Sequence, residues 1–289
     1  MNKEFEFLKI INEALDDNSY LGNDCAYLKE ENLAISSDIL IEDVHFKTSY
    51  MTPYEIAQKA VLVNISDVYA SGSEIKYLTI SLGGKLNCDF IKEFYRGVND
   101  LAKIYNFSVI GGDLVKSDKL VISITAIGKN LSNNLPKRKN AKIGYTVAVC
   151  GEFGTSAQGL FNLELGIKKD YFIDFHKKPK LFPELVEKFS KIEKEYALMD
   201  SSDGLFDCLE QISTQSGVRI DIDYQKIPKK TQDKDFVLFG GEDYSLVCCL
   251  DEKDFIKIPQ LVKIGECKSG SDVFVNGEKI EYRGFKHFE

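Results

Sequence analysis

Acidic and hydroxyl side chains recur along the sequence where apolar runs are interrupted. The segment "AISSDILIEDVHF", residues 34–46, places two serines and an aspartate between apolar stretches, at the predicted end of a strand. In "VNISDVY", Asn64 and Asp67 are three residues apart, so a helix would present both on one face. The candidate ligands of this kind are Asp24, Ser36, Ser37, Asp38, Asp67, Asp113, Asp200 and Asp203.

Each of these residues also has a simpler interpretation. An Asp or Ser before a helix, such as Ser202 or Asp203 in "MDSSDGLF", often only caps that helix. Paired glycines, such as Gly111 and Gly112, often form an ordinary turn, although they also let a backbone approach a ligand closely. Asp67 could lie on the exposed face of an amphipathic helix, but its apolar neighbours leave little polar face. Taken singly, the residues leave both interpretations open.

Taken together, the carboxylates favour a metal site. Carboxylates that a fold brings close repel one another and lose solvation unless cations lie between them. Carboxylate and hydroxyl oxygens without clustered His or Cys suit a hard cation, Mg²⁺ rather than Zn²⁺. Mg²⁺ commonly binds together with phosphates, and the sequence has no Walker motif, so metal bridges and glycine backbone would hold a nucleotide triphosphate. The residues thus predict metal-dependent phosphoryl transfer.

A mixed set of helices and strands must position these residues. Helical spacing of apolar residues, with Pro53 near one helix start and Gly72 at its end, predicts helices at residues 4–15, 53–72, 89–105, 155–167 and 203–217. Strand-like runs occupy residues 25–29, 32–41, 76–84, 107–113, 119–129, 145–151, 219–224, 244–250, 261–267 and 272–277. This is an α+β pattern with hairpin-like strand pairs rather than strict βαβ alternation. The polar, basic segment 130–144 is the expected boundary between two domains, 1–135 and 136–289.

Composition excludes several classes of function. The chain has 289 residues, 44% of them apolar, which is enough for one large domain or two ordinary ones. Its net charge of −8 argues against nucleic acid or an anionic membrane as the main partner. No apolar run approaches the about 20 residues that span a bilayer, and no signal peptide is recognisable, so we expect a cytoplasmic protein. The 7 cysteines include no C-x-x-C pair, which favours buried, reduced thiols.

The order of the motifs resembles a known enzyme family. "GNDCAYL", "ISSDILIEDVHF", "KAVLVNISDVYASG", "VIGGD", "SSDGLFDCLEQIS" and "GGEDYSLV" follow one another as in the thiamine-monophosphate kinases, of the superfamily that includes aminoimidazole ribonucleotide synthetase. The resemblance implies ATP-dependent phosphorylation of thiamine monophosphate to thiamine diphosphate by direct transfer. It also implies a two-domain fold, with an N-terminal α/β domain whose sheet pairs across a homodimer into a barrel and a C-terminal α+β domain.

The resemblance also assigns roles to individual residues. It implies metal binding at the eight candidate ligands named above, with several Mg²⁺ ions, and it implies no side-chain nucleophile. Nucleotide contacts fall on Gly112, Asp113, Arg138 and Ser202. Thiamine phosphate contacts fall on His45, Glu242 and Phe285. The simpler alternative for Arg138 is a solvated hinge, although a guanidinium there suits phosphate oxygens, and without the family Phe285 would be taken for ordinary end packing.

The chain departs from the family pattern in three places. Asn23 stands where members usually have an acid, Leu114 follows "GGD" where a threonine is common, and the stretch before "GGEDY" is short. Two alternatives remain: another ATP-using member, such as a selenophosphate synthetase-like or aminoimidazole ribonucleotide synthetase-like enzyme, or a non-catalytic nucleotide- or thiamine-binding regulator. The N-terminus has no glycine-rich loop with a reactive Cys, which argues against a selenophosphate synthetase. The complete set of acids argues against a degenerate regulator.

Overall fold

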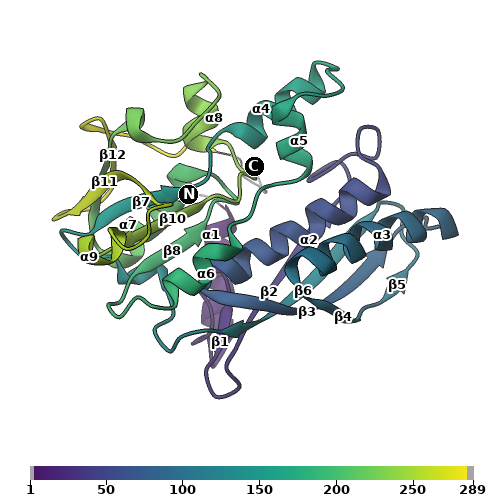
Figure 1. Cartoon of the computed structure of the whole chain (residues 1–289), viewed down its shortest axis with the longest axis horizontal. Helices are drawn as coiled ribbons and strands as arrows, with labels where there is room; N and C mark the ends of the chain where they lie inside the picture. Colours follow the sequence, from purple (N-terminus) through teal and green to yellow (C-terminus); the bar gives the residue numbers. More distant parts are fainter. Residues whose placement is uncertain (1–2, 285–289) are drawn as a thin grey trace.

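The computed structural model describes residues 3–284, whose strands form two sheets (Figure 1). In the first sheet the strand order is β1-β2-β6-β3-β4, with β5 beside β3. Its strands are β1 (Ala26–Leu28), β2 (Leu33–Ile41), β3 (Ser73–Gly83), β4 (Ser108–Gly111), β5 (Leu114–Val115) and β6 (Val121–Asn130). The helices of this half are α1 (Lys3–Ala14), α2 (Pro53–Ala70) and α3 (Cys88–Tyr105). Figure 1 shows α2 and α3 lying across one face of this sheet.

Strand β2 carries the Ser-Ser-Asp triplet in its middle. It pairs antiparallel with β6 along its whole length, from Leu33 opposite Lys129 to Ile41 opposite Val121. The expectation that the triplet ends a strand is therefore wrong. The polar residues interrupt the apolar run, but the alternation of inward and outward side chains continues through them, and that alternation is what defines the strand.

Helix α2 is the central element of the molecule. It begins with a capping box between Thr52 and Glu55, has Pro53 in its first turn, and ends at Ala70, with Ser71 as its C-cap. Almost all of its side chains are buried, because it packs against β2, β3 and β6 of the first sheet and also against β8 of the second. This two-sided burial explains why its sequence is apolar nearly all round.

The first sheet is not built from hairpins alone. Strands β3 and β4 pair in parallel, with α3 as the connection between them, so this part of the chain is a βαβ unit. The prediction of hairpin-like pairs holds for β1 with β2. It does not extend to β3 and β4, where the predicted strand–helix–strand order forms a parallel βαβ unit.

The second sheet has the strand order β13-β12-β9-β11-β7-β10-β8. Its strands are β7 (Thr146–Cys150), β8 (Ala197–Asp200), β9 (Arg219–Ile222), β10 (Leu246–Leu250), β11 (Val262–Lys268), β12 (Val273–Val275) and β13 (Glu278–Lys279). The helical segments of this half are η1 (Arg138–Asn140), α4 (Thr155–Glu164), α5 (Tyr171–Lys177), α6 (Pro183–Phe189), α7 (Leu205–Ser216), η2 (Tyr224–Lys226), α8 (Lys234–Phe239) and α9 (Glu252–Phe255). The predicted mixture of helices and strands is confirmed. Within the described residues, no helix is long and apolar enough to cross a membrane.

Candidate functional site

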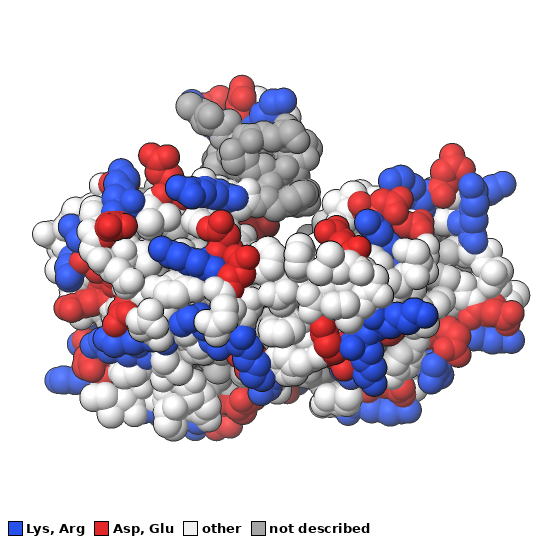
Figure 2. Space-filling view, turned by 90° about the horizontal axis from the view of Figure 1, so that it is seen from above, with Lys and Arg blue, Asp and Glu red and all other residues white. Residues whose placement is uncertain are grey.

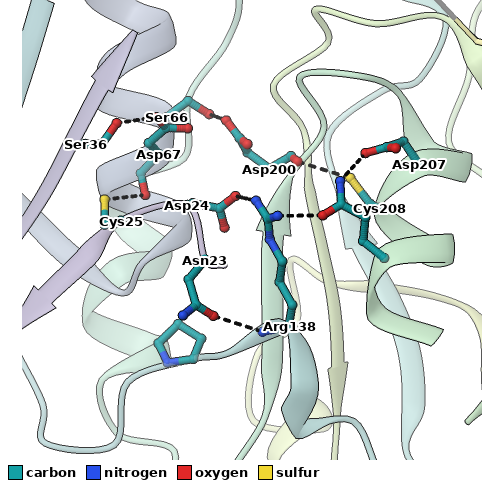
Figure 3. Close-up of polar contacts among 12 residues, drawn as sticks. Asn23, Asp24, Cys25, Ser36, Ser66, Asp67, Arg138, Asp200, Asp207 and Cys208 are labelled. Atoms are coloured by element: carbon teal, nitrogen blue, oxygen red, sulfur yellow. Dashed lines mark hydrogen bonds and ion pairs between the residues drawn. The ribbon is translucent and has the colours of Figure 1, made fainter. Parts of the chain in front are cut away.

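Three carboxylates from distant parts of the chain meet where α2 packs against β8. Asp24 precedes β1, Asp67 lies on α2, and Asp200 is the last residue of β8. One carboxylate oxygen from each of the three lies within 4.8 Å of the others. Asp200 is 2% exposed and the side chain of Asp24 is 7% exposed. Little water therefore screens the repulsion within this acid cluster, which Figure 3 shows with its hydrogen-bond partners.

Two buried serines donate hydrogen bonds to the acid cluster. Ser36 on β2 donates to Asp67 Oδ2, and Ser66 on α2 donates to Asp200 Oδ2. Because Ser66 and Asp67 are neighbours on α2, this helix connects β2 of the first sheet to β8 of the second through side chains. Asp67 and Asp200 are thus held by a helix and a strand, whereas Asp24 lies in the bend before β1.

Burial and mutual repulsion disfavour ionisation of these acids. Burial first, and then the charges of Asp38 and Asp200, raise the pKa of Asp67 well above its ordinary value. Burial, followed by the charge of Asp24, also raises the pKa of Asp200 well above its ordinary value. On β2, burial and the charges of Asp203 and Asp24 raise the pKa of Asp38 to about 6. A cation would relieve this repulsion, and the all-oxygen donor set fits a hard divalent ion such as Mg²⁺.

Arg138 lies against the acid cluster from η1. Its Nη2 donates to Asp24 Oδ1 at 2.7 Å, and its Nη1 donates to Gln211 Oε1 on α7 at 2.5 Å. Gln211 in turn donates to Asp207 Oδ2 at 2.6 Å. The Nε of Arg138 is buried and has no hydrogen-bond partner within residues 3–284. A guanidinium with an unsatisfied N–H beside clustered carboxylates is suited to bind phosphate oxygens that arrive with a metal.

The turn between β8 and α7 presents Ser202 and Asp203 at the surface. Both residues are exposed. The N-cap of α7 is Gly204, and no side chain caps this helix, so the simple capping interpretation is wrong for both. The backbone N–H of Glu242 donates to Ser202 O at 2.6 Å, which ties this turn to the segment 240–245.

A buried lysine joins the two described residues that were expected to contact thiamine phosphate. Lys59, on α2, is 1% exposed. Its Nζ donates to the carbonyl oxygen of His45 at 3.0 Å and lies 2.9 Å from Glu242 Oε1. Glu242 has a φ of 64°, in the left-handed region that a glutamate rarely adopts. The preceding Gly241 permits this turn, because a Cβ there would lie 2.6 Å from Ser202 O.

Comparison with known proteins identifies the family. Residues 22–130 match the family model described as "AIR synthase related protein, N-terminal domain". The thiamine-monophosphate kinase of Aquifex aeolicus is 33% identical over 99% of this chain and 98% of its own length. That of Bacillus subtilis is 36% identical over 87% of each chain. The chain belongs to the thiamine-monophosphate kinase family. A solved structure described as "AaThiL complexed with AMPPCP and TMP" superposes with a TM-score of 0.91 at 32% identity, covering 99% of this chain and 97% of that one.

Not every residue matched to the thiamine-monophosphate kinase pattern lies in the acid cluster. Ser37 is exposed on the other face of β2, and its Oγ donates to Ile124 O at 3.1 Å. Asp113 is exposed in the turn after β4, and its Oδ1 accepts the Leu114 N–H at 2.8 Å. Phe285 lies outside the described residues. The roles of these residues stay predictions.

The structure explains the residue type at Gly112 and gives a role to Asn23. Gly112 has a φ of 154°, and a Cβ there would lie 1.8 Å from Ile80 O, so only glycine fits between β4 and β3. Asn23 Oδ1 accepts the backbone N–H of Arg138 at 3.3 Å. The position that usually carries an acid in the family therefore helps to hold η1 against the N-terminal half.

Sequence reasoning missed three polar residues of this region of the thiamine-monophosphate kinase fold: Lys59, Ser66 and Gln211. Lys59 had a detectable signal, since it is a lone charge in the apolar stretch "KAVLVNI" of a predicted helix. Ser66 and Gln211 had none, because a serine or glutamine on a helix is unremarkable until its partner is known.

Proposed function

We propose that this chain transfers the γ-phosphoryl group of ATP directly to the phosphate of thiamine monophosphate, in a Mg²⁺-dependent reaction that yields thiamine diphosphate and ADP. The observation that carries the proposal is the acid cluster with Arg138 beside it, in a chain 33% identical to a thiamine-monophosphate kinase over nearly its full length. An oxygen of the substrate phosphate attacks the γ-phosphorus as the bond to the β,γ-bridging oxygen breaks. No side-chain nucleophile takes part.

The acids of the site would hold the metal ions. Asp24, Asp67 and Asp200 supply the central oxygens, and Asp38 lies close enough for its pKa to respond to Asp24. Ser36 orients Asp67 through its hydrogen bond. Bound Mg²⁺ would neutralise phosphate charge and bring two anionic reactants together. Asp113 and Ser37 belong to this proposed set from the family pattern alone.

Arg138 and Ser202 would contact the nucleotide phosphates, together with the backbone at Gly112 and Asp113. Arg138 is preorganised for this role, because Asp24 and Gln211 already fix its guanidinium plane. A positioned guanidinium stabilises charge on the transferring phosphoryl group without reorganising during the reaction. His45, Glu242 and Phe285 would contact the thiamine moiety.

We also propose that two copies pair through the first sheet. The face of this sheet opposite α2 carries exposed Ile39 and Tyr77, and the edge strands β4 and β5 expose Ile110, Leu114 and Val115. Exposed apolar residues on an edge strand favour pairing with another strand. A second copy of the same sheet would cover both the face and the edge and could close a barrel. Sedimentation of a fully active monomer at micromolar concentration would contradict this.

The proposed partners are therefore ATP, thiamine monophosphate and a second copy of the chain. On the face seen in Figure 2, Lys and Arg side chains are interspersed with Asp and Glu rather than gathered into a basic patch. We further propose the division into residues 1–135 and 136–289, which is supported by the separation of the strands of the two sheets at this point.

A reaction with purified protein tests the proposed activity. Protein, ATP, Mg²⁺ and thiamine monophosphate should yield thiamine diphosphate and ADP in equal amounts, and excess chelator should stop the reaction. ATP made chiral at the γ-phosphorus should give a product of inverted configuration, because a single in-line displacement inverts that centre. Retention would indicate a phosphoenzyme, and turnover in chelator would exclude the metal role.

A further inference from the structure

We infer that Lys59 is a positioning residue for thiamine monophosphate: it holds the Glu242 carboxylate in place and keeps it ionised. The inference rests on the proposed function, since it concerns how the same substrate is recognised. Lys59 is separated from Glu242 by more than half the chain, yet its Nζ lies 2.9 Å from Glu242 Oε1 and 3.0 Å from His45 O. One buried ammonium thus connects two segments expected to touch the substrate.

The environment of Lys59 requires a charged partner. The side chain is 1% exposed, and a buried ammonium without a counterion would cost several kcal/mol. Glu242 supplies the opposite charge while its own side chain stays 26% exposed. Lys59 takes one oxygen of the carboxylate from inside the protein, which leaves the exposed part of the carboxylate for a ligand.

His176, on α5, lies beside both Lys59 and Glu242 and is neutral. Its Nε2 lies 3.4 Å from Lys59 Nζ, which can only donate, so the proton of the imidazole belongs on Nδ1. Nδ1 lies 2.9 Å from Ser156 Oγ and 3.7 Å from Glu242 Oε2. Burial, helped by the charge of Lys59, lowers the pKa of His176 to about 3. His176 is therefore neutral near pH 7, and the charge of Lys59 makes the largest single contribution in favour of an ionised Glu242.

Ionisation of Glu242 depends on this balance. Burial alone would raise the pKa of Glu242, but the combined effect of Lys59, His176 and His45, led by the charge of Lys59, lowers it below its ordinary value. A lysine-bound carboxylate is a strong hydrogen-bond acceptor, suited to an amino group such as that of the thiamine pyrimidine. The titratable groups that face Glu242 are Lys59 on α2, His176 on α5, His45 and Tyr50 before α2, and Asp243 and Tyr244 in its own segment.

Equilibrium binding of thiamine monophosphate, measured by calorimetry with Mg²⁺ and without ATP, tests the inference. In Lys59→Met the dissociation constant should rise about tenfold or more at pH 6, the usual loss for a hydrogen bond to a charged group. The ratio of variant to wild-type constants should then fall as the pH rises to 8.5. This ratio falls with pH because loss of Lys59 raises the pKa of Glu242 in the variant. The variant carboxylate is then protonated at low pH and recovers its charge at high pH. Using the ratio cancels titration of the ligand itself.

Three further variants distinguish positioning from a structural role. Glu242→Gln should weaken binding at every pH, and Lys59→Met in the Glu242→Gln background should weaken it little further, because Lys59 acts through Glu242. Lys177→Met is the matched control: Lys177 also joins α5 to α2, through Glu55 at 3.0 Å, and should leave binding unchanged. If Lys59→Met does not fold, Lys59→Gln should show the same pH dependence.

The results of these experiments distinguish failure of the proposed role of Lys59 from failure of the proposed reaction. A binding ratio in Lys59→Met that is constant with pH, or additive losses in the double variant, would overturn the role of Lys59. Wild-type protein that binds thiamine monophosphate but makes no thiamine diphosphate would overturn only the proposed reaction. Wild-type protein that does not bind this ligand would overturn both.

Discussion

Asp38→Asn should stabilise the metal-free protein at alkaline pH while removing most of the Mg²⁺-dependent activity. Burial, with the charges of Asp203 and Asp24, raises the pKa of Asp38 from 3.8 to about 6. A rise of this size corresponds to about 3 kcal/mol of unfavourable free energy for the ionised form, at about 1.4 kcal/mol for each pH unit. Asparagine keeps the shape of the side chain and removes the charge.

The pH dependence of this effect has a definite sign. Because the folded protein holds the Asp38 proton up to about pH 6 and the unfolded chain releases it near pH 3.8, wild-type stability falls as the pH rises between these values. The free energy of unfolding of Asp38→Asn should therefore exceed that of wild type by up to about 3 kcal/mol at pH 8. The difference should shrink as the pH falls toward 3.8, and it should vanish below that value, where the wild-type carboxyl is protonated in both states.

Urea unfolding at pH 4.5 and pH 8, with chelator and with Mg²⁺, measures this difference. Mg²⁺ should stabilise wild type at pH 8 more than Asp38→Asn, because the variant lacks one ligand oxygen charge. The same difference in stability at both pH values would show that the effect is not electrostatic. A variant less stable than wild type at pH 8 in chelator would refute the repulsion within this group of acids.

Three further outcomes are expected. Cys25→Ala should keep substantial kinase activity. Burial and the charge of Asp67 raise the pKa of the Cys25 thiol well above its ordinary value, so little of the nucleophilic thiolate is present. Complete loss of turnover would favour a covalent, sulfur-based mechanism. Arg138→Lys should raise the KM for ATP about tenfold or more and change the KM for thiamine monophosphate little. The reason is that an ammonium cannot bind Gln211 and a phosphate in one plane. Equal changes in both KM values would remove Arg138 from the nucleotide site. Gly112→Ala should lower the melting temperature, because its Cβ would meet Ile80 O at 1.8 Å; an unchanged melting temperature would mean that the turn after β4 moves freely.

The sequence predicted the fold class and the main acids, but not their arrangement. Strand β2 was predictable because its buried residues alternate along the chain, and helix α2 because a long apolar run begins at Pro53 and ends before Gly72. The short helices α5, α6, α8 and α9 were not predicted, since segments of so few residues lack a distinctive period. Their packing decides where they form.

Residues whose roles depend on distant partners could not be ranked from the sequence. Asp67 and Ser37 were both proposed as metal ligands, and only the strand register shows that Ser37 faces away from Asp67. Ser66 gave no signal at all until Asp200, 134 residues away, was found beside it. A local pattern carries information about its own period and caps, but not about which element it will face.

The position of Lys59 and Asp67 on one helix gives the site a fixed length. The two residues are eight positions apart on α2, which at 1.5 Å per residue separates them by about 12 Å along the axis. One end of this interval lies at the acid cluster and the other at the Glu242 carboxylate. Because the helix is continuous and buried, the interval cannot stretch when loops or sheets move. Under the proposed function, α2 would therefore set the distance between the phosphate and the far end of a bound substrate, and a compound of a different length would reach only one of these two points.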